Sequence, residues 1–313
     1  MEGPSPTTPD RPASGRRRVG RRPALVDESN EALERRVGAL ETKVALDLDD
    51  VERTVARLDA VDVLADRLAA SIRYSQRVEA EVADLGIETL LPYATDDYDG
   101  RFLEVWVPDE RGHGTALEIL LRRLGLPTYE ARPSDTVPPH NRLAGMLGRL
   151  SANAYEMVSL TYHSIGAINE RLAMAAYTRM AEICRELDQH DLADTLLAPM
   201  RRDESLHLGY YRTYARQLRH RMSSWKLAAV RLLIVHTYSP VGAGQKPDKA
   251  PLGEVLLELE HDPENPSVAE VVQAVADELL AKNDGDTLPP FVRTNLLECL
   301  ELARAERRTA AID

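Results

Sequence analysis

Two short motifs in this sequence each place a carboxylate and an imidazole three residues apart. They are Glu110-x-x-His113 and Glu204-x-x-His207. Residues three apart lie on the same face of a helix, so each motif can bind one metal ion from one side. A single glutamate precedes each motif, Glu88 before the first and Glu170 before the second. Two single glutamates and two Glu-x-x-His motifs on four helices form the ligand set of a dinuclear carboxylate centre.

The Glu-x-x-His motif alone is weak evidence for a metal site, because it also arises by accident. In a chain of this composition about one accidental match is expected. A third match, Glu258-x-x-His261, is followed at once by Asp262 and Pro263 and has no helix with a matching glutamate before it. We interpret this third motif as a solvated helix end.

Spacing along the chain strengthens the interpretation of the first two motifs. In an antiparallel helix pair, two residues lie level when they are equally far from the turn, because every residue advances the helix by the same rise. The midpoint of Glu88 and Glu110 falls in the turn-like segment 96–100, and the midpoint of Glu170 and Glu204 falls beside 188–191, where we expect a break. In each pair, the two carboxylates are therefore expected to lie at the same height along the helix axes.

Composition favours an all-α fold. Phe and Trp are scarce, apolar residues recur at three- and four-residue spacing, and no segment alternates as a strand would. We expect a helical bundle with a long crossover connection, formed by the proline-rich segment 125–140, and with additional C-terminal helices. The expected units are a tail at 1–25, a di-iron helical domain at 26–245 and a C-terminal helical extension at 246–313.

Charge is distributed unevenly. The tail at 1–25 is rich in Arg and Pro and is expected to be disordered, whereas the whole chain carries a net charge of −12. The acidic body makes nucleic acid an improbable partner. The two cysteines, Cys184 and Cys299, lie in apolar helical patterns and are expected to be buried free thiols of a cytoplasmic protein. No segment is apolar enough for membrane insertion.

The motifs resemble those of the soluble acyl-acyl-carrier-protein desaturases, a family of the ferritin-like superfamily. The resemblance covers roughly residues 71–238. It rests on Ile87–Tyr93, Trp106–Gly114, Asn169–Arg171 and Asp203–His207, with Tyr211 four residues later.

The resemblance implies a desaturase that uses two iron ions and O2 to introduce a double bond into an acyl chain on acyl carrier protein. The metal ligands would be Glu88, Glu110, His113, Glu170, Glu204 and His207, with the bridging carboxylates on the two Glu-x-x-His helices. A ferredoxin-type electron donor and a homodimer are further implications. The function would belong to fatty-acid metabolism.

Departures from the family pattern keep other functions open. Gly112 replaces a basic residue, Leu208 replaces an acidic residue, and Ala173 stands where family members often carry a Thr linked to oxygen activation. The spacing from Glu88 to Glu110 is also shorter than in plant-type members. The alternative is a di-iron hydroxylase or N-oxygenase acting on a secondary metabolite. A non-catalytic ferritin-like bundle is the third interpretation, and six intact ligands argue against it.

Residues beside the ligands suggest supporting roles. Asp109 and Asp203 precede the motif glutamates and, as acceptors from the imidazoles, could fix the histidine tautomers; a solvated helix face is the competing interpretation. Trp106 lies one turn before Glu110 and could pack beside the centre or serve electron entry. His163 could supply a third histidine, as in di-iron N-oxygenases, but a core histidine is the simpler interpretation.

Two further groups of residues suggest how a substrate and its carrier would bind. Small side chains flanking Glu170 could leave room for a substrate channel; they are Ala167, Ala173, Ala175 and Ala176. A basic set could dock an acidic carrier protein, although a solvated helix face explains it equally well. Its members are Arg216, Arg219, Arg221, Lys226 and Arg231.

Overall fold

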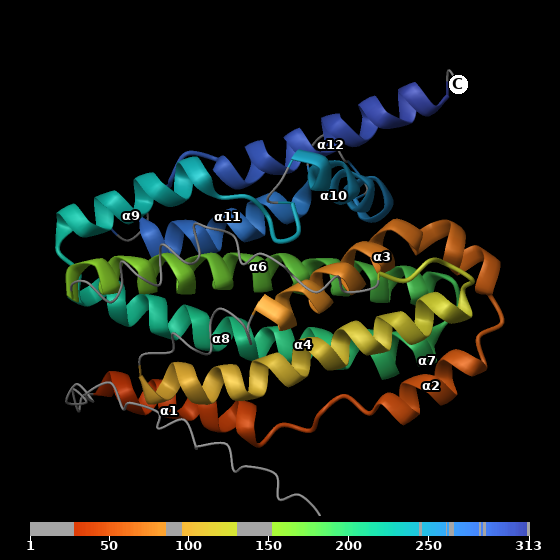
Figure 1. Ribbon diagram of the computed structural model, residues 1–313, viewed down its shortest axis with the longest axis horizontal. Helices are drawn as coiled ribbons and strands as arrows, with labels where there is room; N and C mark the ends of the chain where they lie inside the picture. Colours follow the sequence, from red (N-terminus) through yellow and green to blue (C-terminus); the bar gives the residue numbers. More distant parts are fainter. Residues whose placement is uncertain are drawn as a thin grey trace, which may run out of the picture.

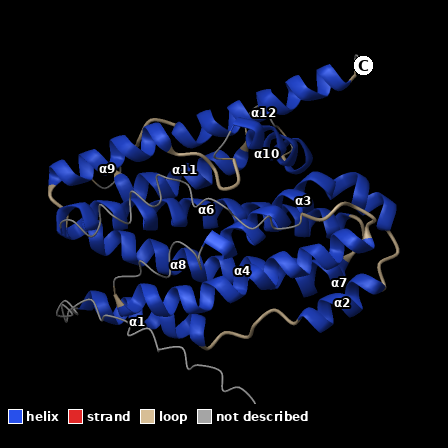
Figure 2. Cartoon of the chain, viewed as in Figure 1, coloured by secondary structure: helices blue, strands red, loops and turns tan. Residues whose placement is uncertain are grey.

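The computed structural model describes residues 28–85, 96–129, 152–243, 246–260, 262, 266–281, 283 and 286–311. These residues form helices and the loops between them, and no strand occurs among them (Figure 2). The predicted all-α fold is therefore confirmed. The tail at 1–25 and most of the proline-rich segment lie outside the described residues.

Four helices form the central bundle. They are α3 (Val61–Leu85), α4 (Asp97–Arg123), α6 (Ala152–Glu186) and α8 (Ala198–Arg221). Helix α3 packs against α4, and α6 packs against α8. Helices α4 and α6 run in the same direction, so the end of α4 and the start of α6 lie at opposite ends of the bundle (Figure 1). This arrangement matches the crossover connection expected from the sequence.

The start of α4 corrects one expectation. The segment 96–100, predicted as a turn, is the beginning of the helix. Asp96 is its N-cap, and its carboxylate accepts a hydrogen bond from the Asp99 backbone N–H at 2.8 Å. An aspartate at this position satisfies one of the N–H groups that the first helical turn leaves without a partner. Helix α4 therefore begins earlier than the composition of this segment suggested.

The expected break after α6 is confirmed. Asp188 has a φ of 58°, a left-handed conformation that ends the helix. The chain then re-enters helix through α7 (His190–Leu192) and a π-helical turn, Ala193–Leu197, that leads into α8. Glu170 and Glu204 are therefore about equally far along the chain from this turn, as expected if their carboxylates lie at the same height along the helix pair.

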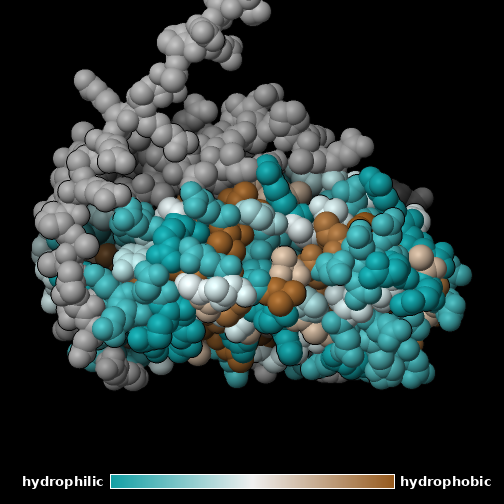
Figure 3. All heavy atoms as spheres, turned by 90° about the horizontal axis from the view of Figure 1, so that it is seen from below, coloured by the Kyte–Doolittle hydropathy of each residue, from teal (hydrophilic) through white to brown (hydrophobic). Residues whose placement is uncertain are grey.

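Two outer layers cover the bundle. Helices α1 (Glu28–Glu41) and α2 (Leu48–Ala56) pack on α4 and α8, and the face of the molecule seen from that side is largely hydrophilic (Figure 3). The opposite layer contains α9 (Ser224–Thr237), α10 (Lys246–Leu259), α11 (Ser267–Leu280) and α12 (Phe291–Ala310), which lie on the α3 and α6 side (Figure 1).

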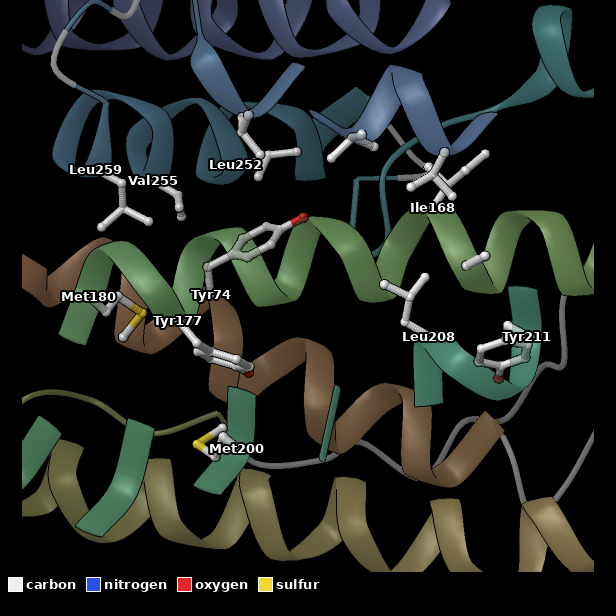
Figure 4. Close-up of a cluster of buried hydrophobic side chains, with 14 of the residues drawn as sticks. Tyr74, Ile168, Tyr177, Met180, Met200, Leu208, Tyr211, Leu252, Val255 and Leu259 are labelled. Atoms are coloured by element: carbon white, nitrogen blue, oxygen red, sulfur yellow. The ribbon is translucent and has the colours of Figure 1, made fainter. Parts of the chain in front are cut away.

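The C-terminal helices continue the hydrophobic core of the bundle. Leu252, Val255 and Leu259 project from α10 towards α6, with Tyr74 of α3 between the two helices (Figure 4). Glu258 is not solvated, contrary to expectation: its carboxylate accepts 2.7 Å hydrogen bonds from the Ala70 and Ser71 backbone N–H groups and from the Ser71 hydroxyl. The residue anchors α10 on α3.

Both cysteines are buried free thiols, as predicted. Among the described helices, none combines the length and apolar character needed to cross a membrane.

Candidate metal centre

Six buried side chains from the four bundle helices converge at its middle. They are Glu79 of α3, Glu110 and His113 of α4, Glu170 of α6, and Glu204 and His207 of α8. Within the described residues they form two groups of potential ligands, one on the Glu79 side and one on the Glu170 side. In each group the candidate ligand atoms lie within 4.8 Å of one another. Glu110 and Glu204 belong to both groups, so these two carboxylates are placed to bridge two metal ions.

Five of the six ligands predicted from the sequence meet in this cluster. Glu88 lies outside the described residues, and Glu79 supplies the fourth carboxylate instead. Glu79 was missed because the segment 96–100, expected to be the turn between the first two helices, is the beginning of α4. A signal was available: Glu79 continues the buried face of α3 formed by Leu68 and Ile72, where a lone acid interrupts an apolar stripe.

Both histidines present Nδ1 to the centre. Nδ1 of His113 lies 3.2 Å from Glu204 Oε1 and 3.8 Å from Glu79 Oε2. Nδ1 of His207 lies 3.3 Å from Glu110 Oε1 and 3.4 Å from Glu204 Oε2. Each Nδ1 therefore faces oxygens of the group to which its own histidine belongs.

The outer nitrogens of the histidines meet Asp109 and Asp203 in a crossed arrangement. Nε2 of His207 on α8 lies 3.0 Å from Asp109 on α4, and Nε2 of His113 on α4 lies 3.4 Å from Asp203 on α8. Donation of the Nε2 hydrogen to a carboxylate leaves Nδ1 free to bind a metal. The contacts fit the supporting role suggested for both aspartates and not that of a solvated helix face.

Two aromatic residues hold the terminal glutamates. Trp106 Nε1 donates a hydrogen bond to Glu170 Oε1 at 3.3 Å, and the Tyr177 hydroxyl donates one to Glu79 Oε1. Trp106 thus packs beside the centre, as one of its two suggested roles requires. Tyr177 was not anticipated, because its position on α6 gave no sign of a partner on α3.

Without metal ions, negative charge on the buried carboxylates of the cluster is energetically unfavourable. Burial and repulsion from Glu79 and Glu204 raise the pKa of Glu110 well above its usual range, and burial and repulsion from Glu204 raise the pKa of Glu170. Burial opposes the charge on His207, but hydrogen bonds to Asp109 and Glu204 prevail and raise its pKa to about 10. The cluster therefore retains protons in place of the cations that its carboxylates would otherwise bind.

The residues fit a pair of divalent metal ions. Three buried atoms that face the centre make charge contacts with imidazole or carboxylate atoms at 3.2–3.3 Å but lack the geometry of a hydrogen bond: Glu110 Oε1, Glu204 Oε1 and His113 Nδ1. Buried polar atoms without a hydrogen bond are rare in folded proteins, and a metal ion would satisfy all three. Four carboxylates and two imidazoles form an oxygen and nitrogen set suited to iron or manganese.

His163 does not belong to the centre. Its Nδ1 contacts the Ser159 carbonyl oxygen at 2.7 Å, its Nε2 lies 2.9 Å from Asp99, and its ring stacks on Tyr214 with centroids 4.0 Å apart. This is the satisfied core histidine expected as the simpler interpretation. The third-histidine arrangement is not observed.

A pocket of about 340 Å³ lies between the bundle and the C-terminal helices. Its walls come from α3, α6, α10 and α11 and are mostly apolar. Ala173, Ala175 and Ala176 line it, whereas Ala167 is buried in the core. The lining residues of α6 extend from Arg171 to Glu182, about 16 Å along the helix axis. The metal ligand Glu79 also lines the pocket.

The basic set suggested for carrier docking is partly engaged within the chain. Arg216 pairs with Glu278 at 2.5 Å, Arg219 donates to the carbonyl oxygens of Glu278 and Ala281, and Lys226 pairs with Glu156 at 2.6 Å. These contacts join α8 to α11 and α9 to α6. Carrier docking by this set stays a prediction.

Comparisons of the chain with protein-family models, curated proteins and solved structures found no match. The molecule is thus a helical protein whose buried carboxylate and histidine clusters could hold two metal ions, an arrangement compatible with a ferritin-like di-iron fold.

Proposed function

We propose that this protein is an O2-dependent di-iron oxidoreductase that oxidises an apolar chain bound in the pocket between α6 and α10. The observation that carries the proposal is the double position of Glu79, which belongs to one ligand group and also lines the pocket. A substrate in this pocket would lie directly beside one metal position. Proximity of this kind is the main requirement for selective oxidation of an unactivated carbon.

The protein side chains prepare the site in three ways. Glu110 and Glu204, which belong to both ligand groups, would be shared by the two metal ions, while Tyr177 and Trp106 fix the carboxylates Glu79 and Glu170. The mostly apolar pocket walls favour the binding of an apolar chain next to the metal positions. Two irons bound by these ligands would supply the oxidising power, with O2 as the oxidant.

Desaturation of an acyl chain on acyl carrier protein is the specific reaction that we favour. The elongated apolar pocket suits a hydrocarbon chain, and the sequence motifs resemble those of the acyl-carrier-protein desaturases. In this reaction two hydrogen atoms leave neighbouring carbons. With two electrons from a ferredoxin-type donor and two protons, they reduce O2 to two water molecules.

Oxygen insertion is the second candidate reaction, and one observation favours it. Ala173, which stands where desaturases often carry Thr, lines the pocket itself. A hydroxyl group that the family uses near the metal is therefore missing from the wall that faces the substrate. Such a change would favour a hydroxylase or N-oxygenase acting on a different apolar substrate.

The test is single-turnover product analysis by mass spectrometry. Protein loaded anaerobically with ferrous iron is mixed with acyl carrier protein bearing chains of several lengths, and then with O2. Loss of two hydrogen atoms from the chain indicates desaturation, and gain of one oxygen atom indicates hydroxylation. An unchanged chain at every length tested would contradict the acyl substrate.

Matched variants test the location of the substrate. Ala176→Leu fills the pocket and is expected to abolish turnover or shift the preferred chain length while iron binding is retained. Ala228→Leu makes the same replacement at an exposed position of α9 and serves as the control. Equal turnover by the two variants would show that the pocket is not the substrate site.

A further inference from the structure

A buried lysine forms ion pairs with two aspartates beside the candidate metal ligands. Lys43 is in the loop that joins α1 to α2, and its side chain is only 6% exposed, whereas its neighbour Val44 is 77% exposed. Lysine is almost never buried unless it is paired, because the ammonium group loses its hydration. The position therefore requires an explanation from its partners.

The partners are the two aspartates that contact the ligand histidines. Nζ of Lys43 lies 2.8 Å from Asp109 Oδ1 and 3.0 Å from Asp203 Oδ2. Asp109 in turn contacts Nε2 of His207, and Asp203 contacts Nε2 of His113. One ammonium group thus joins the outer hydrogen-bond partners of both ligand histidines, which belong to different ligand groups.

The loop that carries Lys43 is fastened to the bundle on both sides. Arg202, the neighbour of Asp203 on α8, donates a hydrogen bond to the Val44 carbonyl oxygen at 2.8 Å. Arg101 on α4 pairs with Glu34 and Glu41 of α1, just before the loop. These contacts hold the lysine backbone against both helices that carry a Glu-x-x-His motif.

Charge counting explains why a cation is needed at this place. Four ligand carboxylates balance two divalent ions, so Asp109 and Asp203 add two negative charges in a nearly dry region. Their side chains are 9% and 1% exposed. Two buried carboxylates without a cation would repel each other, and one would bind a proton or turn away from its histidine.

We propose that Lys43 is a positioning residue for both metal ions: it holds Asp109 and Asp203 so that each directs one histidine Nδ1 towards the centre. The inference depends on the metal centre and not on the substrate or on the type of oxidation. It assigns the loop between α1 and α2 a role that no motif in the sequence indicates.

The test is an anaerobic titration with ferrous iron of the wild-type protein and of Lys43→Met, Lys43→Arg and Lys249→Met. Loss of the hydrogen-bond partner of a ligand typically weakens metal binding about 10–100-fold. Lys43→Met leaves both aspartates in place but removes the cation that holds them, so it is expected to weaken the binding of both ions by up to this amount. Lys43→Arg retains the charge and is expected to restore most of the affinity. Lys249→Met removes the 2.6 Å ion pair with Glu298 on α12 and is the control.

The reduction potential gives a second readout that a merely structural role would not move. Removing a positive charge near the irons makes addition of an electron less favourable, so the midpoint potential of loaded Lys43→Met is expected to fall. Wild-type affinity and an unchanged potential in Lys43→Met would overturn the proposal. Failure of the wild-type protein to bind iron would instead contradict the metal centre itself.

A charge-neutral double variant covers the case in which Lys43→Met does not fold. Lys43→Met combined with Asp109→Asn removes one charge of each sign and is compared with Asp109→Asn alone. The double variant is expected to bind the ion held by His113 more weakly than Asp109→Asn alone does, because in the double variant Asp203 has also lost its cation. Equal affinities in the two proteins would overturn the role of Lys43.

Discussion

Asp109 on α4 accepts a hydrogen bond from Nε2 of His207 on α8, with 3.0 Å between the two atoms. The equivalent contact runs the other way, from His113 on α4 to Asp203 on α8. Each Glu-x-x-His motif thus supplies its own histidine and, through the preceding aspartate, orients the histidine of the other motif. The two helices depend on each other for the geometry of the centre.

This crossed arrangement predicts that each aspartate supports the ion on the opposite motif. Asp109→Asn should lower the affinity for the ion bound by His207 more than the affinity for the ion bound by His113. Asp203→Asn should have the opposite effect. The expected loss at the affected ion is about 10–100-fold. Stepwise ferrous iron titration followed by optical spectroscopy measures the two affinities. Equal effects of both variants on both ions would contradict the pairing.

Metal binding is expected to strengthen as the pH rises. The pKa of His207 is raised to about 10, and that of His113 is also raised, so both imidazoles hold protons at neutral pH in the metal-free protein. A metal ion must displace these protons, and the displacement is easier at higher pH. Titrations between pH 6 and 9, with an indicator for proton release, measure the effect; affinity that does not change with pH would contradict it.

The buried network around His163 is expected to contribute to stability and not to metal binding. His163→Ala leaves Asp99 without one of its partners, Tyr210 being the other, and should lower the free energy of unfolding by about 1–3 kcal/mol. His190→Ala, at a side chain that is 61% exposed, is the control and should change stability by less than about 0.5 kcal/mol. Denaturant unfolding measures both. Loss of iron stoichiometry in His163→Ala would contradict its separation from the centre.

The close contact between α10 and α12 predicts that Gly253 cannot be enlarged. A Cβ atom at this position would lie 2.1 Å from the Cys299 carbonyl oxygen, so Gly253→Ala must move one helix. The expected cost is about 1–3 kcal/mol of unfolding free energy, and the pocket wall formed by α10 should shift. Gly38→Ala in α1, where an added Cβ atom would approach nothing beyond the local backbone of its own helix within 4 Å, is the matched control and should be neutral or stabilising. Equal thermal stability of the two variants would contradict the contact.

Much of the architecture could be predicted because it depends on local patterns. The spacing of apolar residues predicted the helices. The midpoint between Glu170 and Glu204 predicted the turn at Asp188 where the chain reverses direction. The start of α4 was misplaced because a run of acids and glycine is typical of both a turn and a capped helix start, and only the Asp96 side-chain contact distinguishes them. Because of that error, Glu79 was not predicted as a metal ligand.

Long-range contacts explain what else could not be predicted. Lys43 lies far in sequence from Asp109 and Asp203, and a lone lysine after a helix is ordinarily solvated. The pocket depends on how α10 and α11 pack on α6, which the spacing of apolar residues within single helices does not specify.

The central claim is that Glu110 and Glu204 bridge two metal ions, and metal stoichiometry tests it most directly. Wild-type protein loaded anaerobically with ferrous iron is expected to bind two irons per chain and to change its optical spectrum on exposure to O2. Because Glu110 and Glu204 belong to both ligand groups, Glu110→Ala and Glu204→Ala should each lose both irons, whereas Glu118→Ala, at a more exposed position of α4, should retain them. Substoichiometric iron in the wild-type protein, or two irons retained in either bridge variant, would contradict the account.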